Sequence, residues 1–326
     1  MTDTLRWGLL GCGAISRTFA RDIQLAPGNE LIAVGSRDGA KAAAFVAAHC
    51  PAAVAHGSYA ALVADPRIQA VYVATPHSRH AQDALLAIAA GKHVLVEKAF
   101  TLNRAQAEQV LAAAAAAKVF CGEAMWTRFL PVMAAVRGWI RSGRIGRVER
   151  IEADFSFATA FDPANRLFAA DCAGGALLDV GCYVVALALD VAGRAPDTVR
   201  ATARFTPNGV DGATTMVCLW EPEGLRAQLT CALDEARDQG ARIIGSTGVI
   251  DIPVFFSAKE AVLRCQDGST ERASGAAGFQ FEIGAALTAI RAGASASPEM
   301  SHAHTLALMG LLDQVRAQIG LRYPGE

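Results

Sequence analysis

The stretch "GLLGCGAIS", residues 8–16, decides the fold of the first part of the chain. It lies between a strand-like run and a helical run, and it places Gly11 and Gly13 on the first two positions of the pattern G-x-G-x-x-G, with Ser16 on the third. Glycine at the first position makes a tight turn, and at the second it lets the backbone approach a pyrophosphate at the helix N-terminus. The pattern predicts a dinucleotide site with these binding residues: Gly11, Cys12, Gly13, Ala14 and Ile15.

The first third of the chain alternates β-type runs with helical runs, which is typical of βαβ units and a parallel sheet. This context separates a dinucleotide-binding turn from glycines that merely turn the chain. We therefore predict an α/β Rossmann domain over residues 1–122. The expected strands are residues 5–11, 30–36, 70–75 and 93–98, and the expected helices are residues 15–25, 39–50, 78–91 and 104–118.

The rest of the chain, residues 123–326, has a different pattern. Alternating runs follow one another with few helices between them, which predicts a large, mostly antiparallel sheet that is open on one face. A helix is expected at residues 301–320, which have apolar residues at helical spacing and a closing glycine. This predicts an α+β domain. Its expected strands lie within residues 148–158, 199–205, 214–221, 226–234, 241–252 and 261–267.

The composition favours a small-molecule partner. Thirty Lys and Arg residues nearly balance 31 Asp and Glu residues, so we expect neither nucleic acid nor membrane as a partner. The eight cysteines are scattered without a C-x-x-C pair, which predicts reduced thiols and no metal site. We see no export signal and no charge-free run that could span a bilayer, so a cytoplasmic protein is expected.

The end of the second expected strand indicates which dinucleotide binds. An acidic residue is usual there in NAD-binding proteins, but Ser36 and Arg37 occupy the tip. A hydroxyl and a guanidinium suit a 2′-phosphate, which favours NADP over NAD. The alternative is that Arg37 is a solvated loop residue and Asp38 binds the ribose.

Two further strands end at the same edge of the predicted sheet, where open α/β sheets bind ligands. Lys98 at that edge could hydrogen-bond a substrate hydroxyl and lower the pKa of a neighbouring acid, or it could point into solvent. His77 and His80 are spaced i and i+3, but two histidines alone do not make a metal site, so pocket lining or a helix surface is expected there instead of a metal. The candidate cofactor-binding residues at this edge are Thr75, Pro76, His77, His80, Glu97 and Lys98.

The stretch "GGALLDVGCYVVALALD", residues 174–190, is apolar and long enough for a buried helix. It contains Asp179 and Tyr183 at positions i and i+4, which lie on one face of a helix. A buried carboxylate needs a partner, and Lys98 is a natural candidate. The alternative is a capped core helix in which Tyr183 merely packs.

Together these features resemble the Gfo/Idh/MocA family of NAD(P)-dependent oxidoreductases. The resemblance covers nearly the whole chain and rests on "GCGAIS", "VATPHSRH", the "EK" of "VEKAF", and "DVGCY". Three more stretches, "EAMWTRFLP", "GGALLDVGCY" and "YPGE", are similar to the branch of dimeric dihydrodiol dehydrogenase and NADP-dependent D-xylose dehydrogenase. In this chain Ala99 stands where the family usually has proline after the lysine.

The resemblance implies a Rossmann domain followed by an α+β domain whose open sheet commonly forms subunit contacts, so a homodimer is expected. It also implies that Lys98, Asp179 and Tyr183 are catalytic, with Tyr183 as the acid/base. A free tyrosine has a pKa of about 10, so a nearby ammonium that favours the phenolate would make it a better base. Side chains early in the second part of the chain could contact a sugar ring or an arene, or could equally be ordinary core or surface. These candidate substrate-binding residues are Trp126, Arg128, Phe129, Phe161 and Arg166.

Three functions remain open at this point. The first is an NADP-dependent dehydrogenase acting at the anomeric carbon of an aldose such as D-xylose. The second is a trans-dihydrodiol dehydrogenase or dicarbonyl reductase. The third is a non-catalytic NADP-sensing regulatory protein, which the joint presence of Lys98, Asp179 and Tyr183 disfavours.

Overall fold

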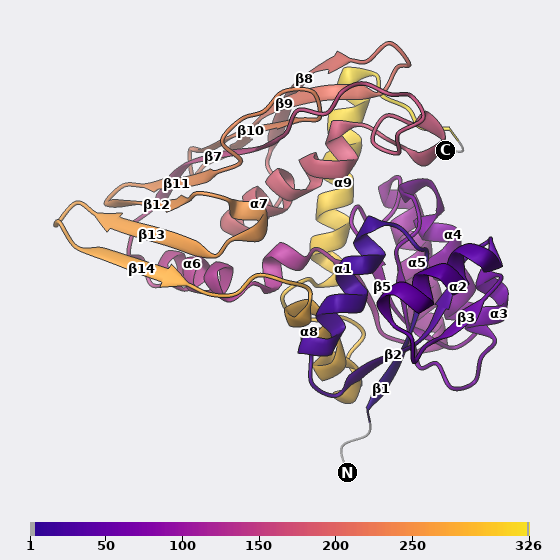
Figure 1. Cartoon of the computed structure of the whole chain (residues 1–326). Coiled ribbons are helices and arrows are strands. Elements are labelled where there is room, and N and C mark those ends of the chain that lie inside the picture. The colour runs from indigo at the N-terminus through magenta and orange to yellow at the C-terminus, as the bar shows by residue number, and fades with distance from the viewer. Residues whose placement is uncertain (1–3, 325) are drawn as a thin grey trace. The chain divides into compact units, whose positions relative to one another are not determined.

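The structure, a computed structural model, describes residues 4–324 and 326. The chain divides into two compact units (Figure 1). Unit 1 consists of the residues up to Trp126 together with Gly278–Leu306, and unit 2 consists of Thr127–Ala277 together with Ala307–Glu326. A boundary at residue 122 differs from this division, because it assigns Gly278–Leu306 to the second domain.

Unit 1 is built on a six-stranded parallel sheet with the strand order β3-β2-β1-β4-β5-β6. The order reverses beside β1, so the carboxyl ends of β1 and β4 adjoin at the switch point where such sheets bind ligands. This confirms the predicted Rossmann architecture. The strands are β1 (Leu5–Leu10), β2 (Asn29–Gly35), β3 (Val54–His56), β4 (Ala70–Val73), β5 (His93–Glu97) and β6 (Cys121–Ala124). The helices are α1 (Ala14–Asp22), α2 (Gly39–His49), α3 (Tyr59–Val63), α4 (His80–Ala89), α5 (Arg104–Ala117) and α8 (Gln280–Arg291).

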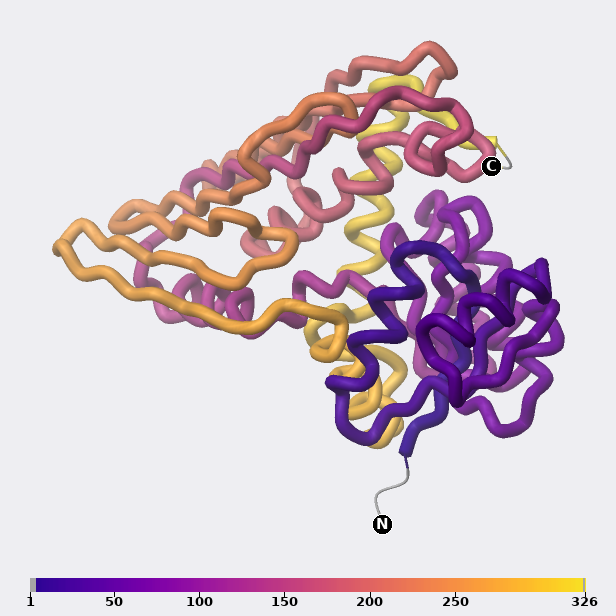
Figure 2. Tube along the Cα trace, viewed as in Figure 1, coloured from indigo at the N-terminus to yellow at the C-terminus, as the bar shows by residue number. Residues whose placement is uncertain are grey.

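The helix α8 enters unit 1 from a distant part of the sequence. Figures 1 and 2 show it in gold beside the indigo helix α1. Its buried residues Ile283 and Leu287 belong to the same core cluster as Trp7 and Phe19. At its start, the Phe279 amide donates to the Asp22 carboxylate at 2.9 Å. This packing explains why Gly278–Leu306 belongs to unit 1, although nothing in its local pattern indicates that.

The sequence patterns missed the short or irregular elements. In unit 1 they missed β3, α3, β6 and α8, and a boundary at residue 122 would cut through β6. In unit 2 they missed the helix Pro131–Arg141 and the strand Thr270–Ser274, and they merged two strands within residues 241–252. Short elements span too few residues to show a period, so tertiary packing decides them.

Unit 2 contains an eight-stranded sheet with the strand order β14-β13-β12-β11-β7-β10-β9-β8. Only the β10–β7 pair is parallel among the described pairs of this sheet, which confirms the mostly antiparallel α+β prediction. The strands are β7 (Val148–Ser156), β8 (Thr198–Phe205), β9 (Asp211–Trp220), β10 (Leu225–Ala232), β11 (Ala241–Gly245), β12 (Gly248–Ile252), β13 (Glu260–Cys265) and β14 (Thr270–Ser274).

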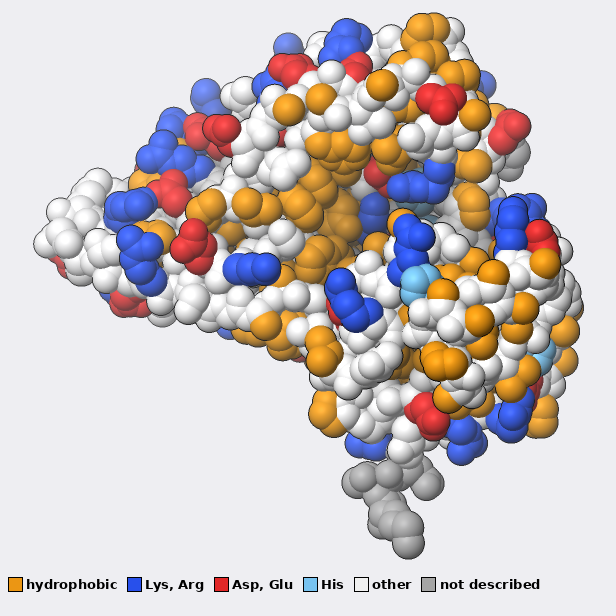
Figure 3. Space-filling view, in the orientation of Figure 1, with side chains coloured by type: hydrophobic (Ala, Val, Ile, Leu, Met, Phe, Trp, Pro, Cys, Tyr) orange, Lys and Arg blue, Asp and Glu red, His pale blue; other side chains and the backbone are white. Residues whose placement is uncertain are grey.

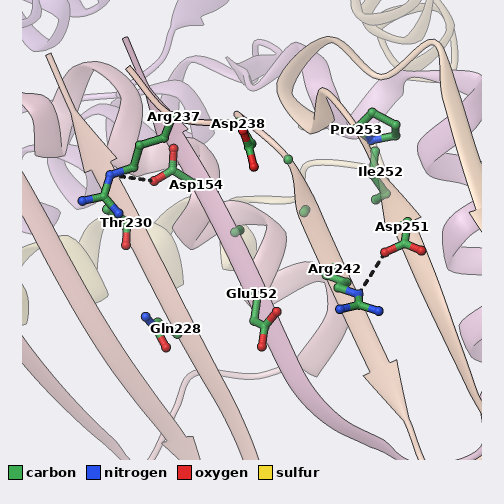
Figure 4. Close-up of a pocket in the computed structure, with 13 residues that line it drawn as sticks. Glu152, Asp154, Gln228, Thr230, Arg237, Asp238, Arg242, Asp251, Ile252 and Pro253 are labelled. Atoms are coloured by element: carbon green, nitrogen blue, oxygen red, sulfur yellow. Dashed lines mark hydrogen bonds and ion pairs between the residues drawn. The ribbon is translucent and has the colours of Figure 1, made fainter. Parts of the chain in front are cut away.

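The two faces of this sheet differ in character. The helix α7 (Cys182–Ala192) packs against β7 and β10, and α6 (Pro131–Arg141) packs against β13 and β14. Polar side chains of β7, β10, β11 and β12 line an open depression, in which Arg242 pairs with Asp251 at 3.0 Å (Figure 4). Figure 3 shows basic and acidic side chains interspersed over β11 to β14. The last helix, α9 (His302–Ile319), begins in unit 1 and ends in unit 2.

The segment before α7 is not a regular α-helix. Leu177–Gly181 forms a π-helical turn, so the predicted i and i+4 relation of Asp179 and Tyr183 runs through a wider turn than in an α-helix. Within the described residues, Ala170–Ala192 is one helical stretch that is long and apolar enough, by length and composition alone, to cross a membrane. The expectation that no run could do so was therefore too broad. Because 94% of its most apolar window is buried in the structure, this is weak evidence for a membrane span.

Candidate functional site

The two glycines of the first turn have different roles. Gly11 has φ +104°, and a Cβ atom there would lie 2.5 Å from the Ala74 carbonyl oxygen. Gly13 is the N-cap residue of α1 with φ −83°, and a Cβ atom there would meet no heavy atom of the described residues within 4 Å. The fold therefore requires glycine at Gly11, while at Gly13 the chain itself leaves the space open. A ligand that approaches the N-terminus of α1 explains the second glycine.

This difference predicts opposite results for two matched substitutions. Gly11→Ala should lower the free energy of unfolding by about 2 kcal/mol or more, because of the backbone contact and the left-handed φ. Gly13→Ala should keep the melting temperature but weaken dinucleotide binding about tenfold or more, since its Cβ would intrude only on the ligand. Thermal melts and calorimetric titration with NADP check both. Wild-type affinity in Gly13→Ala would contradict the assigned ligand position.

At the end of β2, the structure shows the surroundings of both candidates for the ribose contact. The Asp38 carboxylate caps α2, accepting from the amides of Ala40 at 2.9 Å and Lys41 at 3.3 Å. Arg37 is exposed, and the buried Ser36 hydroxyl accepts from the Asp38 amide at 3.2 Å. Because Asp38 already has this structural role, the arrangement favours Ser36 and Arg37 as the phosphate-binding pair.

Sequence reasoning missed a second cation beside this turn. Lys41 is exposed in the first turn of α2 and lies close enough to Cys12 to act on its thiol. Burial raises the pKa of that thiol, while the hydrogen bond with Ser36 and the charge of Lys41 act in the opposite direction. The position of Lys41, four residues after Arg37, was the available signal. Arg37 and Lys41 together provide two positive charges near the end of β2.

Among the predicted cofactor-binding residues after β4, His80 has its contacts inside the unit. His80 is buried, with its Nδ1 2.8 Å from the Ala99 carbonyl oxygen and its Nε2 2.8 Å from the Thr75 carbonyl oxygen. It therefore links the end of β4 to the segment after β5, inside the unit. Burial lowers the pKa of His80, although both carbonyl contacts oppose that shift. The neighbouring His77 is also buried, and its ring lies 5.4 Å from the His80 ring.

Lys98 follows directly after β5 and is half-buried, unlike a lysine that points freely into solvent. Its amide donates to Glu97 Oε2 at 3.1 Å. The other oxygen of the buried Glu97 accepts a short hydrogen bond from the Tyr72 hydroxyl. The peptide bond between Lys98 and Ala99 is cis. The backbone at Lys98 is thus held by a buried carboxylate and, through Ala99, by His80.

In unit 2, Asp179 and Tyr183 both lie almost fully buried near the start of α7. The Arg166 guanidinium pairs with the Asp179 carboxylate at 3.0 Å, so Asp179 has an arginine partner within its own unit that the sequence did not indicate. The Tyr183 ring lies 5.3 Å from the Phe155 ring and 6.4 Å from the Phe256 ring. Phe155 and Phe256 stack on each other at 3.9 Å. Tyr183 therefore lies beside the stacked rings of Phe155 and Phe256, which we call the aromatic wall.

The remaining candidate substrate residues have mixed surroundings. Arg128 is buried, and its guanidinium lies 3.0 Å from the Asp190 carboxylate. Arg137 binds the same carboxylate at 3.0 Å, so Arg128 has a structural role. Trp126 packs on Phe279 in unit 1, with the ring centres 5.4 Å apart. Phe129 is half-buried at the end of a short 3-10 helix, and the exposed Phe161 packs edge-on against Phe168. Sequence reasoning missed Phe155 and Phe256, although the alternation of β7 places Phe155 on its inner face.

Two sets of candidate residues, one in each unit, have members that lie close together. In unit 1 the glycine turn, the end of β2 and the segments after β4 and β5 meet at the carboxyl edge of the parallel sheet. In unit 2 Arg166, Asp179 and Tyr183 lie together with the aromatic wall, whereas Arg128 belongs to the buried pair with Asp190.

Known proteins resemble both units. A model described as an oxidoreductase family with an NAD-binding Rossmann fold matches residues 5–124, and a model of the GFO/IDH/MocA C-terminal domain matches residues 133–251. The D-xylose 1-dehydrogenase (NADP(+)) of Hypocrea jecorina is 31% identical, over 98% of this chain and 93% of that protein. The trans-1,2-dihydrobenzene-1,2-diol dehydrogenase of Sus scrofa is also 31% identical, over 99% of both chains.

A solved structure agrees with these matches. The 3-ketoreductase KijD10 from Actinomadura kijaniata, in complex with NADP and TDP-benzene, is 28% identical and superimposes with a TM-score of 0.86. The match covers 97% of this chain and 98% of that one. With both family models matched in chain order and relatives aligned along nearly its whole length, the chain belongs to the Gfo/Idh/MocA family of oxidoreductases.

Proposed function

We propose that the chain is an NADP-dependent dehydrogenase that oxidises a sugar hydroxyl, at the anomeric carbon of an aldose such as D-xylose. The observation that supports this most is the full-length similarity to a D-xylose 1-dehydrogenase (NADP(+)). The open space at Gly13 and the role of Asp38 as a helix cap agree with it, because they leave the α1 N-terminus, Ser36 and Arg37 to a phosphorylated dinucleotide.

A second function has its own observation. The stacked rings of Phe155 and Phe256 beside Tyr183 would suit a flat, apolar substrate. A trans-dihydrodiol dehydrogenase or dicarbonyl reductase is therefore the alternative function. The similarity to the dihydrodiol dehydrogenase of Sus scrofa agrees with it. Retention of Lys98, Asp179 and Tyr183 disfavours the third function, a regulatory protein that only senses NADP.

The choice of NADP over NAD depends on Arg37. Arg37→Ala should weaken NADP binding about tenfold or more while NAD binding stays unchanged, because a charge-assisted contact with the 2′-phosphate is lost. Arg6→Ala is the matched control, since Arg6 is an exposed arginine at the opposite end of β1. Calorimetric titration of both variants with both dinucleotides measures this. An equal loss of affinity for NADP and NAD would show that Arg37 contacts a part of the dinucleotide that both cofactors share.

We propose Lys98, Asp179 and Tyr183 as the catalytic residues. NADP, when bound, accepts the hydride from the carbon that is oxidised. Tyr183 takes the proton of the substrate hydroxyl, so that proton and hydride leave the same C–O–H group and the carbonyl bond forms. The Lys98 ammonium favours the charged form of the tyrosine. Asp179, held by Arg166, supplies a fixed negative charge on the same helical stretch as Tyr183.

The substrate panel that tests this follows NADP reduction by absorbance, with aldoses, cyclic polyols and dihydrodiols as substrates and NAD as the control cofactor. We expect turnover with aldoses and with NADP. Turnover confined to dihydrodiols would select the second function. Tight NADP binding without any turnover would select the regulatory one.

Two further proposals concern the assembly and its location. We propose a homodimer in which the open face of the unit 2 sheet pairs with a second copy, because the charged depression on that face offers both signs of charge to its counterpart (Figure 4). Sedimentation velocity should then give twice the 34.0 kDa of one chain. We also propose a cytoplasmic location, since the eight cysteines, all within the described residues, form no disulfide. Cell fractionation checks it.

A further inference from the structure

The π-helical turn that contains Asp179 packs closely against the neighbouring strands β9 and β10. A Cβ atom at Gly175, where φ is +123°, would lie 2.2 Å from Asp211 Oδ1 at the start of β9. A Cβ atom at Gly181 would lie 2.9 Å from the Cys231 sulfur on β10. The turn is therefore in close contact with both strands at its two ends, and the contact at its beginning is made by the Asp211 carboxyl.

The Asp211 side chain also holds the backbone of this turn. It has no exposed surface, and its Oδ2 accepts from the Leu177 amide at 2.8 Å and from the Thr214 hydroxyl at 2.8 Å. Leu177 is the first residue of the π-helical turn. Amides in the first turn of a helix lack partners within it, so an acceptor from another element fixes where the turn begins. For Leu177 that acceptor is Asp211.

We infer that Asp211 is a positioning residue for Asp179 and Tyr183. It fixes the start of the π-helical turn, which contains Asp179 and leads directly into the helix that carries Tyr183. In the described part of the chain, its side-chain hydrogen bonds go to Leu177 and Thr214 and not to Asp179 or Tyr183, so its effect passes through the backbone from Leu177 to Tyr183. The inference rests on the proposed function for its effect on turnover, but its effect on the turn itself does not depend on any activity. A displacement of about 1 Å at a catalytic group can cost about 100-fold in rate, so a loosened turn would be visible in kcat.

The groups around Asp211 explain its ionisation. Burial raises the pKa of Asp211 to about 7, while its hydrogen bonds with Thr214 and the Leu177 amide act in the opposite direction. The other titratable groups facing it are the buried Tyr323 hydroxyl and the Cys231 thiol, whose pKa values are both raised by their own burial first and by Asp211 second. Both protonation states of the carboxyl retain an oxygen that accepts from Leu177, so acceptor geometry, and not charge, is the property that positions the turn.

Three variants separate this role from general stability. Asp211→Ala removes the acceptor, and we expect kcat to fall about 100-fold with the KM for NADP unchanged, since the dinucleotide turn lies in unit 1. Asp211→Asn keeps the shape and one carbonyl acceptor, so it should stay within about threefold of wild-type kcat. Leu263→Ala removes a fully buried side chain of β13 and should lower the melting temperature while kcat is kept.

Hydrogen exchange of residues 177–183, measured by mass spectrometry, reports on the turn without any substrate. It should be faster in Asp211→Ala than in either Asp211→Asn or Leu263→Ala. If the wild type turns over no substrate, the proposed function fails and the exchange measurement alone decides this inference. Unchanged exchange in Asp211→Ala, or a loss of kcat in Asp211→Asn as large as in Asp211→Ala, would overturn it. If Asp211→Ala does not fold, the kcat of Asp211→Asn decides.

The pH dependence of stability provides a second check on the buried carboxyl. Because the pKa of Asp211 is about 7 in the folded chain and about 4 when unfolded, the folded state binds this proton more tightly. Its contribution is thus fully present below about pH 4 and is lost as pH rises toward 7. Asp211→Asn should remove this part of the decline in melting temperature between these limits. An identical pH profile in wild type and Asp211→Asn would show that Asp211 is not a buried acid.

Discussion

We expect Tyr183→Phe to lower kcat for sugar oxidation by about 10²- to 10⁴-fold, the usual contribution of a general acid or base, with NADP affinity unchanged. The substitution removes only the hydroxyl. The ring itself is almost fully buried against Phe155 and Phe256, and phenylalanine can keep both contacts. NADP affinity should hold, because the glycine turn and the end of β2 belong to unit 1. Steady-state kinetics and calorimetric titration on the same preparation measure the two effects.

Tyr323→Phe is the matched control for that substitution. Tyr323 is another buried tyrosine of unit 2, and its hydroxyl has no hydrogen-bond partner among the described residues. Removing that hydroxyl should therefore leave kcat within experimental error. If Tyr183→Phe behaved like Tyr323→Phe, then Tyr183 would be a packing residue, as the alternative interpretation of the apolar helix has it.

The sequence predicted those parts of the molecule whose signals are local. The glycine turn combines a special φ at Gly11 with an open helix N-terminus at Gly13, and both leave a mark in a few adjacent residues. The alternation of buried and exposed side chains over the first four residues of β10 likewise indicates a strand with two different faces. Such features depend on the period of a few residues, so they can be recognised without knowing the rest of the fold.

The features that escaped prediction depend on residues that are distant in the sequence. The helix α8 joins the core of unit 1 through contacts with residues more than 250 positions earlier, and no local pattern indicates its destination. The π-helical turn has the apolar composition of an ordinary helix. Its hydrogen bond from the Leu177 amide to Asp211 forms only when the fold brings β9 next to the turn. Arg166 as partner of Asp179 is of the same kind, because a loop decides which charge reaches a buried carboxylate. The supporting contacts of the candidate residues could therefore not be predicted from the sequence.

We expect Lys98→Met to lower kcat about 100-fold and to move the half-maximal rate of oxidation to higher pH, because the ammonium that favours the charged tyrosine is lost. Methionine keeps the unbranched stem, and the amide hydrogen bond to Glu97 does not depend on the side chain. The exposed Lys118 at the end of α5 provides the control Lys118→Met, which should keep the wild-type rate and pH profile. A lower rate with an unshifted profile would mean that Lys98 binds substrate without acting on the base.

The double variant Lys98→Met with Tyr183→Phe tests whether the two residues act as one device. If Lys98 works by activating Tyr183, then nothing remains for it to activate once the hydroxyl is gone, and the double variant should be hardly slower than Tyr183→Phe alone. If the two losses instead multiply, Lys98 contributes by itself, for example by binding the substrate oxygen. Because the residues come from different units of the chain, strong non-additivity would also establish that both units contribute to one reaction centre.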